Sequence, residues 1–257
     1  MKTTLSLSLI FSAQLLLLAN TQAAIATAGD VMLTGFNADG TDDLAFVLLS
    51  SYDANTTIYF TDNEWDGSAF NTGENYWSWN AAVNLDAGTI VNLSTLSSIA
   101  SVAASVGTVA FNGSPSNPGL SASGESIYVY MGSSYDTAAP TFLTALATGG
   151  FINASPTGLL TNTGLTAGST AVVFTGGEDI AAYTASRTDQ LSFTDYQSKL
   201  ANPSNWTSQN ASGDQDQDGI GPDVPFSSAP FTTVPEPSQT LLLGLIGVFA
   251  ACRRQTR

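Results

Sequence analysis

Histidine is absent from this sequence, and its single cysteine, Cys252, lies close to the C-terminus. The rest of the chain therefore has no thiol nucleophile and can form no internal disulfide bond. Without histidine, the chain cannot use Ser-His-Asp or Cys-His catalysis, cannot bind zinc through imidazole, and lacks the most common general base of enzymes. These absences exclude many enzyme classes, and an enzyme of this composition would have to rely on carboxylates.

Positive charge is also scarce between the two ends of the chain. Residues 24–237 contain all 21 acidic residues but only two cations, Arg187 and Lys199, so their net charge is −19. Such a body repels nucleic acids and anionic lipid headgroups, which excludes nucleic acid as a partner. It suits divalent cations or a hydrated exopolysaccharide matrix, although an acidic surface can also serve solubility alone.

The N-terminus has the pattern of a secretory signal peptide. Lys2 precedes a largely apolar run over residues 5–18, and small residues follow that run. The order basic, apolar and small is typical of signal peptides, whereas a first core helix does not explain it. We predict a signal peptide over residues 1–23, with further cleavage positions available up to residue 28.

A second apolar run closes the chain in VPEPSQTLLLGLIGVFAACRRQTR. Pro235 and Pro237 prevent a regular helix, residues 240–252 carry no charge, and Arg253 and Arg254 follow. A basic end after an apolar run is retained on the cytoplasmic side of a membrane. The run is shorter than the roughly 20 residues of a full transmembrane helix, so a buried C-terminal helix is the alternative to an anchor.

The tail as a whole resembles a known sorting signal. Val234, Pro235, Glu236 and Pro237, then a Leu/Gly-rich run, then an arginine pair are similar to the PEP-CTERM signal of Gram-negative, biofilm-forming bacteria, over residues 234–257. The resemblance implies a temporary membrane anchor that an exosortase, a membrane-embedded cysteine peptidase, recognises and removes. With the signal peptide it implies Sec-dependent export across the inner membrane, then display at the cell surface or in the extracellular matrix.

The body between these signals reads as strands and turns. Alternating apolar, β-branched and aromatic residues recur in TTIYFTDN, GTIVNLST, GTVAFNGS and STAVVFTGG, and each run ends in Ser, Thr, Asn, Asp or Gly. This pattern predicts an all-β sandwich over residues 28–212, with one short helix over 194–200.

Several segments of the body also resemble one group of proteins. AGDVMLTGFNADGTDDLAFVLL, IYFTDNEWDGSAFNTGE, SASGESIYVYMG, PTFLTAL and NPSNW together are similar to uncharacterised secreted bacterial modules that look like the lamin-tail β-sandwich, over residues 28–206. The resemblance implies a fold and an exported location, and no biochemical activity.

The segment GDQDQDGIGPD is a candidate calcium loop. Carboxylates at alternate positions precede a glycine, as at the start of known calcium loops: Asp214, Asp216 and Asp218. Asp223 could add an oxygen ligand, but Pro225 occupies the place of the final EF-hand glutamate, so this is no EF-hand. The alternative is a solvated linker, and we assign residues 213–233 as an acidic, proline-rich linker to the tail.

Two further loops are rich in oxygen ligands. FNADGTDD carries Asp39, Asp42 and Asp43, and FTDNEWDG carries four more side chains: Asp62, Asn63, Glu64 and Asp66. We predict calcium at the first loop, while turns closed by Asx side chains explain both loops without metal. A glycosidase pair could in principle come from the glutamates of the body: Glu64, Glu74, Glu125 and Glu178.

Trp77 and Trp79 share one face of a predicted strand, because side chains alternate along a strand. Buried, they would belong to the sandwich core; exposed, they would form a platform for stacking on sugars. We therefore expect an exported, non-enzymatic surface or matrix protein, with a carbohydrate- or ice-binding module as the alternative and a polysaccharide hydrolase as a third hypothesis.

Overall fold

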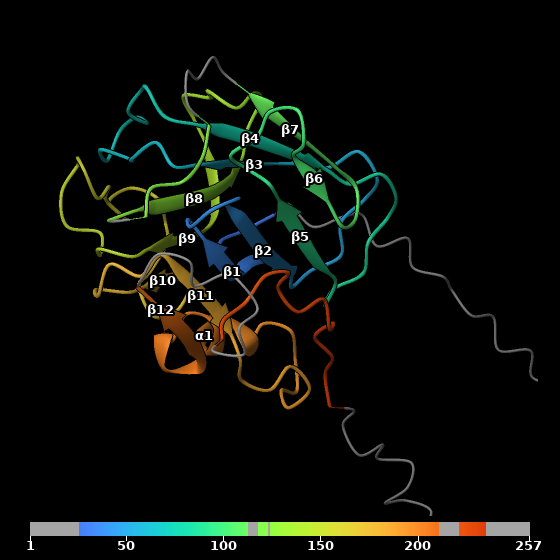
Figure 1. Cartoon of the computed structure of the whole chain (residues 1–257). Helices are drawn as coiled ribbons and strands as arrows, with labels where there is room; N and C mark the ends of the chain where they lie inside the picture. Colours follow the sequence, from blue (N-terminus) through green and yellow to red (C-terminus); the bar gives the residue numbers. More distant parts are fainter. Residues whose placement is uncertain (1–25, 113–117, 123, 211–220, 235–257) are drawn as a thin grey trace, which may run out of the picture.

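The computed structural model describes residues 26–112, 118–122, 124–210 and 221–234, which fold into two facing β-sheets (Figure 1). The first sheet has six strands in the order β12, β11, β1, β2, β5, β6, and all its neighbouring strands are antiparallel. Its strands are β1 (Val31–Asn37), β2 (Asp43–Leu48), β5 (Ile90–Ser94), β6 (Ala103–Ala104), β11 (Ile180–Tyr183) and β12 (Trp206–Gln209).

The second sheet has the order β10, β9, β8, β3, β4, β7, and only the pairing of β10 with β9 is parallel. Its strands are β3 (Thr57–Thr61), β4 (Tyr76–Asn80), β7 (Thr108–Asn112), β8 (Ser126–Met131), β9 (Thr141–Ala147) and β10 (Ala171–Val173). The two sheets confirm the predicted all-β sandwich.

One short helix, α1 (Tyr196–Leu200), confirms the helix predicted over residues 194–200. It buries Tyr196 and Leu200 and lies against β1. A 3-10 turn, η1 (Pro203–Asn205), follows and leads into β12, where the Trp206 indole N–H donates to the Leu200 carbonyl at 2.8 Å. This contact attaches the helix to the edge strand of the first sheet.

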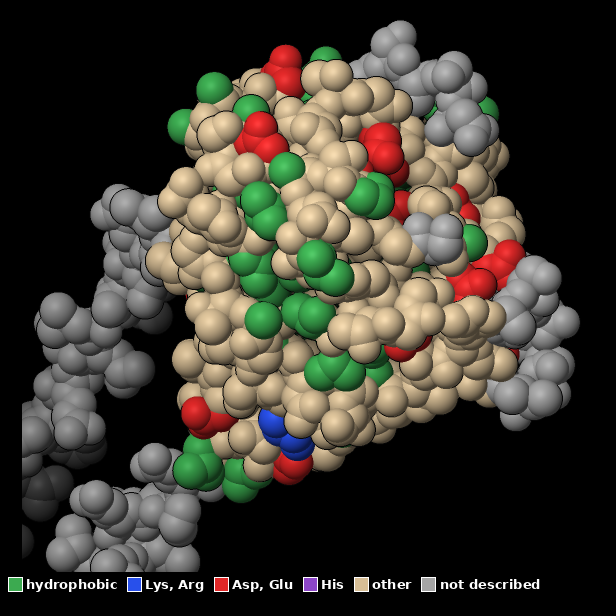
Figure 2. All heavy atoms as spheres, turned by 90° about the vertical axis from the view of Figure 1, so that its left-hand side faces the viewer, with side chains coloured by type: hydrophobic (Ala, Val, Ile, Leu, Met, Phe, Trp, Pro, Cys, Tyr) green, Lys and Arg blue, Asp and Glu red, His purple; other side chains and the backbone are tan. Residues whose placement is uncertain are grey.

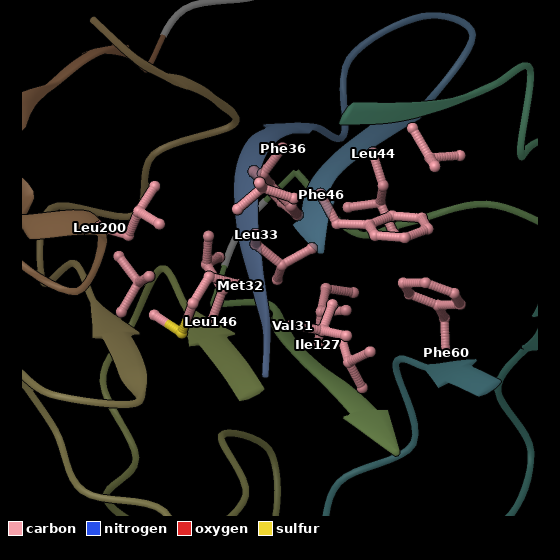
Figure 3. Packing of buried hydrophobic residues seen from close by; sticks show 14 of the residues in the cluster. Val31, Met32, Leu33, Phe36, Leu44, Phe46, Phe60, Ile127, Leu146 and Leu200 are labelled. Atoms are coloured by element: carbon pink, nitrogen blue, oxygen red, sulfur yellow. The ribbon is translucent and has the colours of Figure 1, made fainter. Parts of the chain in front are cut away.

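The main core lies between the two sheets and contains side chains from both (Figure 3). The Phe46 ring of β2 lies 5.2 Å from the Phe60 ring of β3 and 5.3 Å from Trp79 of β4, centroid to centroid. The first pair is tilted and the second is edge-to-face, and such aromatic contacts add to the free energy gained by burying the rings. In β4 the side chains alternate between half-buried and buried, which directs Trp77 and Trp79 into the core.

The second sheet is buried on its outer face as well. A second apolar cluster there joins Tyr128 and Tyr130 of β8 and Phe142 of β9 to two rings from the β3–β4 loop, Trp65 and Phe70. The Trp65 ring lies 5.0 Å from Phe142, edge to face. Because loops cover this face, β8 is buried almost throughout instead of alternating between buried and exposed residues.

Residues 224–234, which we call the C-terminal strap, pack against the sandwich. Phe226 packs on Ala45 and Ile180 at the outer face of the first sheet, whereas Phe231, which is 1% exposed, belongs to the main core cluster. A Cβ on Gly35 would lie 2.6 Å from the Phe226 ring, so only glycine fits beneath it. Residues 224–233 were predicted as part of an acidic, proline-rich linker, but they pack against the sandwich and belong to the folded body.

Candidate functional site

A pocket of about 480 Å³ opens at one end of the sandwich, where loops from both sheets meet. Asp42 lies in the β1–β2 turn, Asp62 directly follows β3, and Glu125 directly precedes β8. The pocket lining also includes Glu74, Asn75 and Gly119. Four carboxyl groups from three loops that are distant in sequence thus surround one cavity.

Asp42 connects the first sheet to the loop between β7 and β8. It has φ 54°, a left-handed conformation that aspartate tolerates better than most residues. Its Oδ2 accepts a hydrogen bond from the Leu120 N–H at 2.7 Å. A Cβ on Gly119 would lie 2.5 Å from this oxygen, so glycine is needed there. Burial, with a smaller contribution from Asp43, raises the pKa of Asp42 to about 6.

Asp62 and Asn75 form the centre of the pocket wall. The Asn75 N–H donates to Asp62 Oδ1 at 2.6 Å, and Asn75 Nδ2 donates to Asp62 Oδ2 at 2.7 Å. The same amide nitrogen donates to the Gly119 carbonyl at 2.7 Å. Burial raises the pKa of Asp62 to about 7, although the hydrogen bonds from Asn75 oppose the shift. Asn75 therefore holds the end of β3, the start of β4 and the β7–β8 loop together.

Glu125 and Glu74 differ in how they are held. Glu125 is 7% exposed, and its two oxygens accept from the N–H groups of Ser121 at 2.6 Å and Ser126 at 2.8 Å. Burial, then the nearby Asp62, raises its pKa well above the ordinary value. Glu74 lies at the exposed rim, and among the described residues its carboxylate accepts no hydrogen bond. It is the pocket carboxylate most available to a ligand.

Within the part of the chain that the structure describes, no basic side chain compensates these four carboxyl groups. Lys199 forms an ion pair with Asp189, and Arg187 is bonded to the strap. On the face of the molecule in Figure 2, acidic side chains are spread from the upper part to the lower edge, and blue appears at one place only, near the lower edge and beside acidic side chains. The pocket therefore favours a cation or a ligand rich in hydroxyl groups over an anion.

In the predicted calcium loop at residues 39–43, Asp42 and Asp43 have different surroundings and different roles. Asp43 Oδ2 accepts from Asn37 Nδ2 at 3.0 Å and from Thr41 Oγ1 at 3.2 Å, while its Oδ1 accepts from the Thr95 N–H. Asp43 therefore closes the turn, and only Asp42 lines the pocket. Within residues 26–112, 118–122, 124–210 and 221–234, Asp39, Asp42 and Asp43 are not part of any group of three potential ligands placed to hold a metal ion.

The remaining candidates fall in different places. Asp66 closes an exposed turn by accepting hydrogen bonds from Ser68 and Ala69, which lower its pKa. Of the four glutamates considered for a glycosidase pair, Glu74 and Glu125 line the pocket, whereas Glu64 and Glu178 do not. The sequence could not show that Glu74 and Glu125 line the same pocket.

The tryptophan platform proposed for sugar stacking is wrong. Trp77 and Trp79 are both 0% exposed. Their indole N–H groups donate to carbonyls inside the protein, Trp79 to Val106 at 2.7 Å and Trp77 to Leu96 at 3.4 Å. Because β4 directs both rings toward the first sheet, they fill the core and cannot stack on a ligand.

The second calcium prediction lies mostly outside the described residues. Asp214, Asp216 and Asp218 are not among them, and Asp223 is described and half-buried. The anchor predicted over residues 240–252 also lies outside them. Within the described part of the chain, no helix combines the length and the apolar character that crossing a membrane requires.

Calcium binding by residues 213–223 stays a prediction with a direct test. A ligand that binds only the folded chain stabilises it by about 2.7 kcal/mol at a hundredfold excess over Kd. Millimolar calcium should therefore raise the Tm of residues 24–237 by several degrees more than sodium chloride of equal ionic strength. The double variant Asp216→Ala, Asp218→Ala should lose part of this gain. Equal responses to the two salts would indicate screening alone.

Comparison with known proteins identifies the C-terminal end. A family model for the PEP-CTERM protein-sorting motif matches residues 233–257 and confirms the predicted signal with Val234, Pro235, Glu236, Pro237 and its arginines. Motifs of this kind mark proteins exported to the cell envelope or surface of Gram-negative bacteria, and they imply an exosortase as the processing enzyme. No curated protein and no solved structure matches the chain, so the resemblance to lamin-tail modules is not confirmed.

Proposed function

We propose that this chain is a non-enzymatic protein of the cell surface or extracellular matrix, released from a temporary membrane anchor by an exosortase. The observation that carries the proposal is the sorting motif at residues 233–257, which directly follows a folded, strongly acidic β-sandwich. An N-terminal run with the order of a signal peptide supports Sec-dependent export.

The hydrogen bonds of the pocket support a binding role over catalysis. Glycoside hydrolysis needs two carboxyl groups that flank the scissile bond, one as general acid and the other as nucleophile or base. Both oxygens of Asp62 and both oxygens of Glu125 accept hydrogen bonds that hold the pocket walls, and Asp42 accepts one from Leu120. Among the described pocket carboxylates, Glu74 is the one whose oxygens accept no such bond, whereas Asp42, Asp62 and Glu125 each have a structural role that an acid or base would have to share.

Replacing Pro235, Glu236 and Pro237 with alanine tests the sorting step. In a host that has an exosortase, the full chain should be shortened at its C-terminus and delivered to the cell surface or medium. The triple-alanine variant should accumulate at full length in the membrane fraction. A variant with alanines at Ser238, Gln239 and Thr240 is the matched control and should be processed normally. Equal processing of both variants would contradict the proposal.

A hydroxyl-rich ligand such as an exopolysaccharide is a second candidate, favoured by the uncompensated carboxyl groups of the pocket. Fragments of the host's matrix polysaccharide should shift the NMR signals of the pocket loops in residues 24–237. Glu74→Gln should weaken binding, and Glu178→Gln, outside the pocket, should leave it unchanged. Release of new reducing ends in the same mixture would reveal a hydrolase and overturn the non-enzymatic assignment. Burial of Trp77 and Trp79 removes one observation that would have favoured a carbohydrate- or ice-binding surface.

A further inference from the structure

The strap is fixed to the sandwich as far as Val234, the residue before Pro235 and already within the matched sorting motif. The Phe231 N–H donates to the Gly88 carbonyl at 2.9 Å, and the Phe231 ring lies 4.8 Å from the Tyr196 ring, edge to face. Its ring also lies 5.6 Å from that of Tyr183. Phe231 thus anchors the strap in a fully buried aromatic cluster, four residues before Pro235.

Hydrogen bonds continue from this anchor to the end of the strap. The Thr232 N–H donates to the Arg187 carbonyl and the Val234 N–H to the Gln190 carbonyl, both at 2.8 Å. Thr233 pairs with Gln190 in a parallel β-bridge. The Tyr196 hydroxyl donates to the Thr232 carbonyl at 2.8 Å. The backbone immediately before Pro235 is therefore paired and is not free for a second partner.

Arg187, one of the two cations of the body, also holds the strap. Its Nη1 donates to the carbonyls of Ser227 at 3.1 Å and Ala229 at 2.8 Å. Its guanidinium carbon lies 5.2 Å from the centre of the Phe231 ring. A positive group over an aromatic face stabilises this arrangement further. Arg187 therefore contacts the strap at two places, the carbonyls of Ser227 and Ala229 and the ring of Phe231.

Sensitivity to a peptidase depends on whether the backbone near the cleavage position is buried and hydrogen-bonded. An enzyme that acts at the motif and also holds residues before it must compete with the sandwich for residues 231–234. We infer that release of this end of the strap from the sandwich controls the rate of exosortase processing. The inference rests on the proposed function. Where the strap leaves and rejoins the sandwich faster than the exosortase cleaves, the rate of processing follows the fraction of chains in which the strap is released.

A disulfide across the β-bridge tests the inference in the full chain. Gln190 and Thr233 are bridge partners, so cysteines at both positions meet the distance requirement of a disulfide, and an exported protein reaches an oxidising compartment. All chains in the test carry Cys252→Ser. The oxidised variant Gln190→Cys, Thr233→Cys should be processed at least about tenfold more slowly, and a reductant should restore the rate. Each single cysteine variant is a matched control.

A loosened strap gives the opposite change. Arg187→Gln removes the guanidinium from the strap while keeping a polar side chain, and it should accelerate processing several-fold in pulse-chase experiments. Where the engineered disulfide does not form, this comparison decides the question.

Equal rates for the locked chain and its single-cysteine controls would overturn the inference, because the exosortase would then act on a docked strap. Equal rates for Arg187→Gln and the parent chain, in the absence of the disulfide, would overturn it too. Failure of the proposed function is distinct: the parent chain itself would then not be processed, or the triple-alanine variant would be processed like the parent.

Discussion

Replacing Gly88 with alanine should lower the Tm of residues 24–237 by roughly 10 °C or more, at about 2–4 °C for each kcal/mol in a chain of this size. Gly88 has φ +91°, and a Cβ there would lie 2.1 Å from the Phe231 carbonyl oxygen. This neighbour is backbone and cannot rotate away, so the strap has to leave its position. The chain then loses the burial of Phe231, which is of the order of 3–5 kcal/mol, in addition to the cost of the left-handed backbone.

Gly164→Ala separates these two causes. Gly164 has φ +74°, and a Cβ there would meet no atom within 4 Å. Alanine at this position therefore experiences the backbone cost alone, about 1–2 kcal/mol, and should lower the Tm by only a few degrees. The measurement is calorimetric melting of both variants beside the parent chain. If the two alanines cost the same, the strap contributes little to the stability of the body.

Local patterns in the sequence were sufficient for the sandwich and for part of its interior. Alternation in NYWSWNAA predicted a strand, and the core interpretation of Trp77 and Trp79 follows from the same two-residue period. The helix was predicted over residues 194–200 from Asp195 near its start and Lys199 near its end, as the helix dipole prefers, and α1 lies within that range. These elements depend on neighbouring residues only, which is why one sequence could indicate them.

The pocket could not be predicted in the same way, because it depends on the order of strands in the sheets. Asp62 and Asn75 meet because β3 pairs with β4, and Glu125 joins them because β3 also pairs with β8. Asp42 arrives from the opposite sheet. One local signal was available: each of these polar residues stands directly beside a strand end or in a tight turn, where a side chain can reach a neighbouring loop.

The strap was misinterpreted for a related reason. Its sequence, VPFSSAPFTTV, is rich in proline and serine, which is typical of linkers. Its two phenylalanines are separated by four residues and fit neither a helical nor a strand period. Their burial depends on Gly35 and Gly88, which leave space for the strap on the first sheet. Such complementarity between distant segments has no local signature.

The body should be more stable at pH 5 than at pH 8, by a few kcal/mol and roughly 5 to 15 °C in Tm. In the folded state burial raises the pKa of Asp62 to about 7 and that of Asp42 to about 6, from an ordinary value of 3.8, and raises the pKa of Glu125 as well. Between the ordinary aspartate pKa of 3.8 and the raised values of about 6 and 7, the folded chain binds more protons than the unfolded chain. The stability contribution is therefore complete below about pH 4 and is lost as the pH rises through 6 and 7.

Two exposed aspartates have a lowered pKa and therefore change the stability in the opposite direction, but at pH values below this range. Hydrogen bonds lower the pKa of Asp66 and, with the help of Lys199, that of Asp189. Their contribution is present above the ordinary aspartate pKa and is lost only as the pH falls below it. Comparing pH 5 with pH 8 therefore isolates the pocket carboxyl groups.

Asp62→Asn identifies the group responsible for the pH dependence. Each pKa unit corresponds to about 1.4 kcal/mol of stability. Asp62 is 3% exposed, and its pKa rises furthest among the pocket carboxyl groups to which a pKa value is given above, so it makes the largest contribution of these. Its replacement should reduce the difference in Tm between pH 5 and pH 8 by roughly a third, since Asp42, Glu74 and Glu125 continue to titrate. Asp53→Asn, at an exposed position outside the pocket, should leave the difference unchanged. A Tm that rises from pH 5 to pH 8, or an unchanged difference in Asp62→Asn, would contradict the assignment.

The same experiment reports on ligand binding, because a cation that enters the pocket favours the ionised carboxylates and should reduce the loss of stability at pH 8.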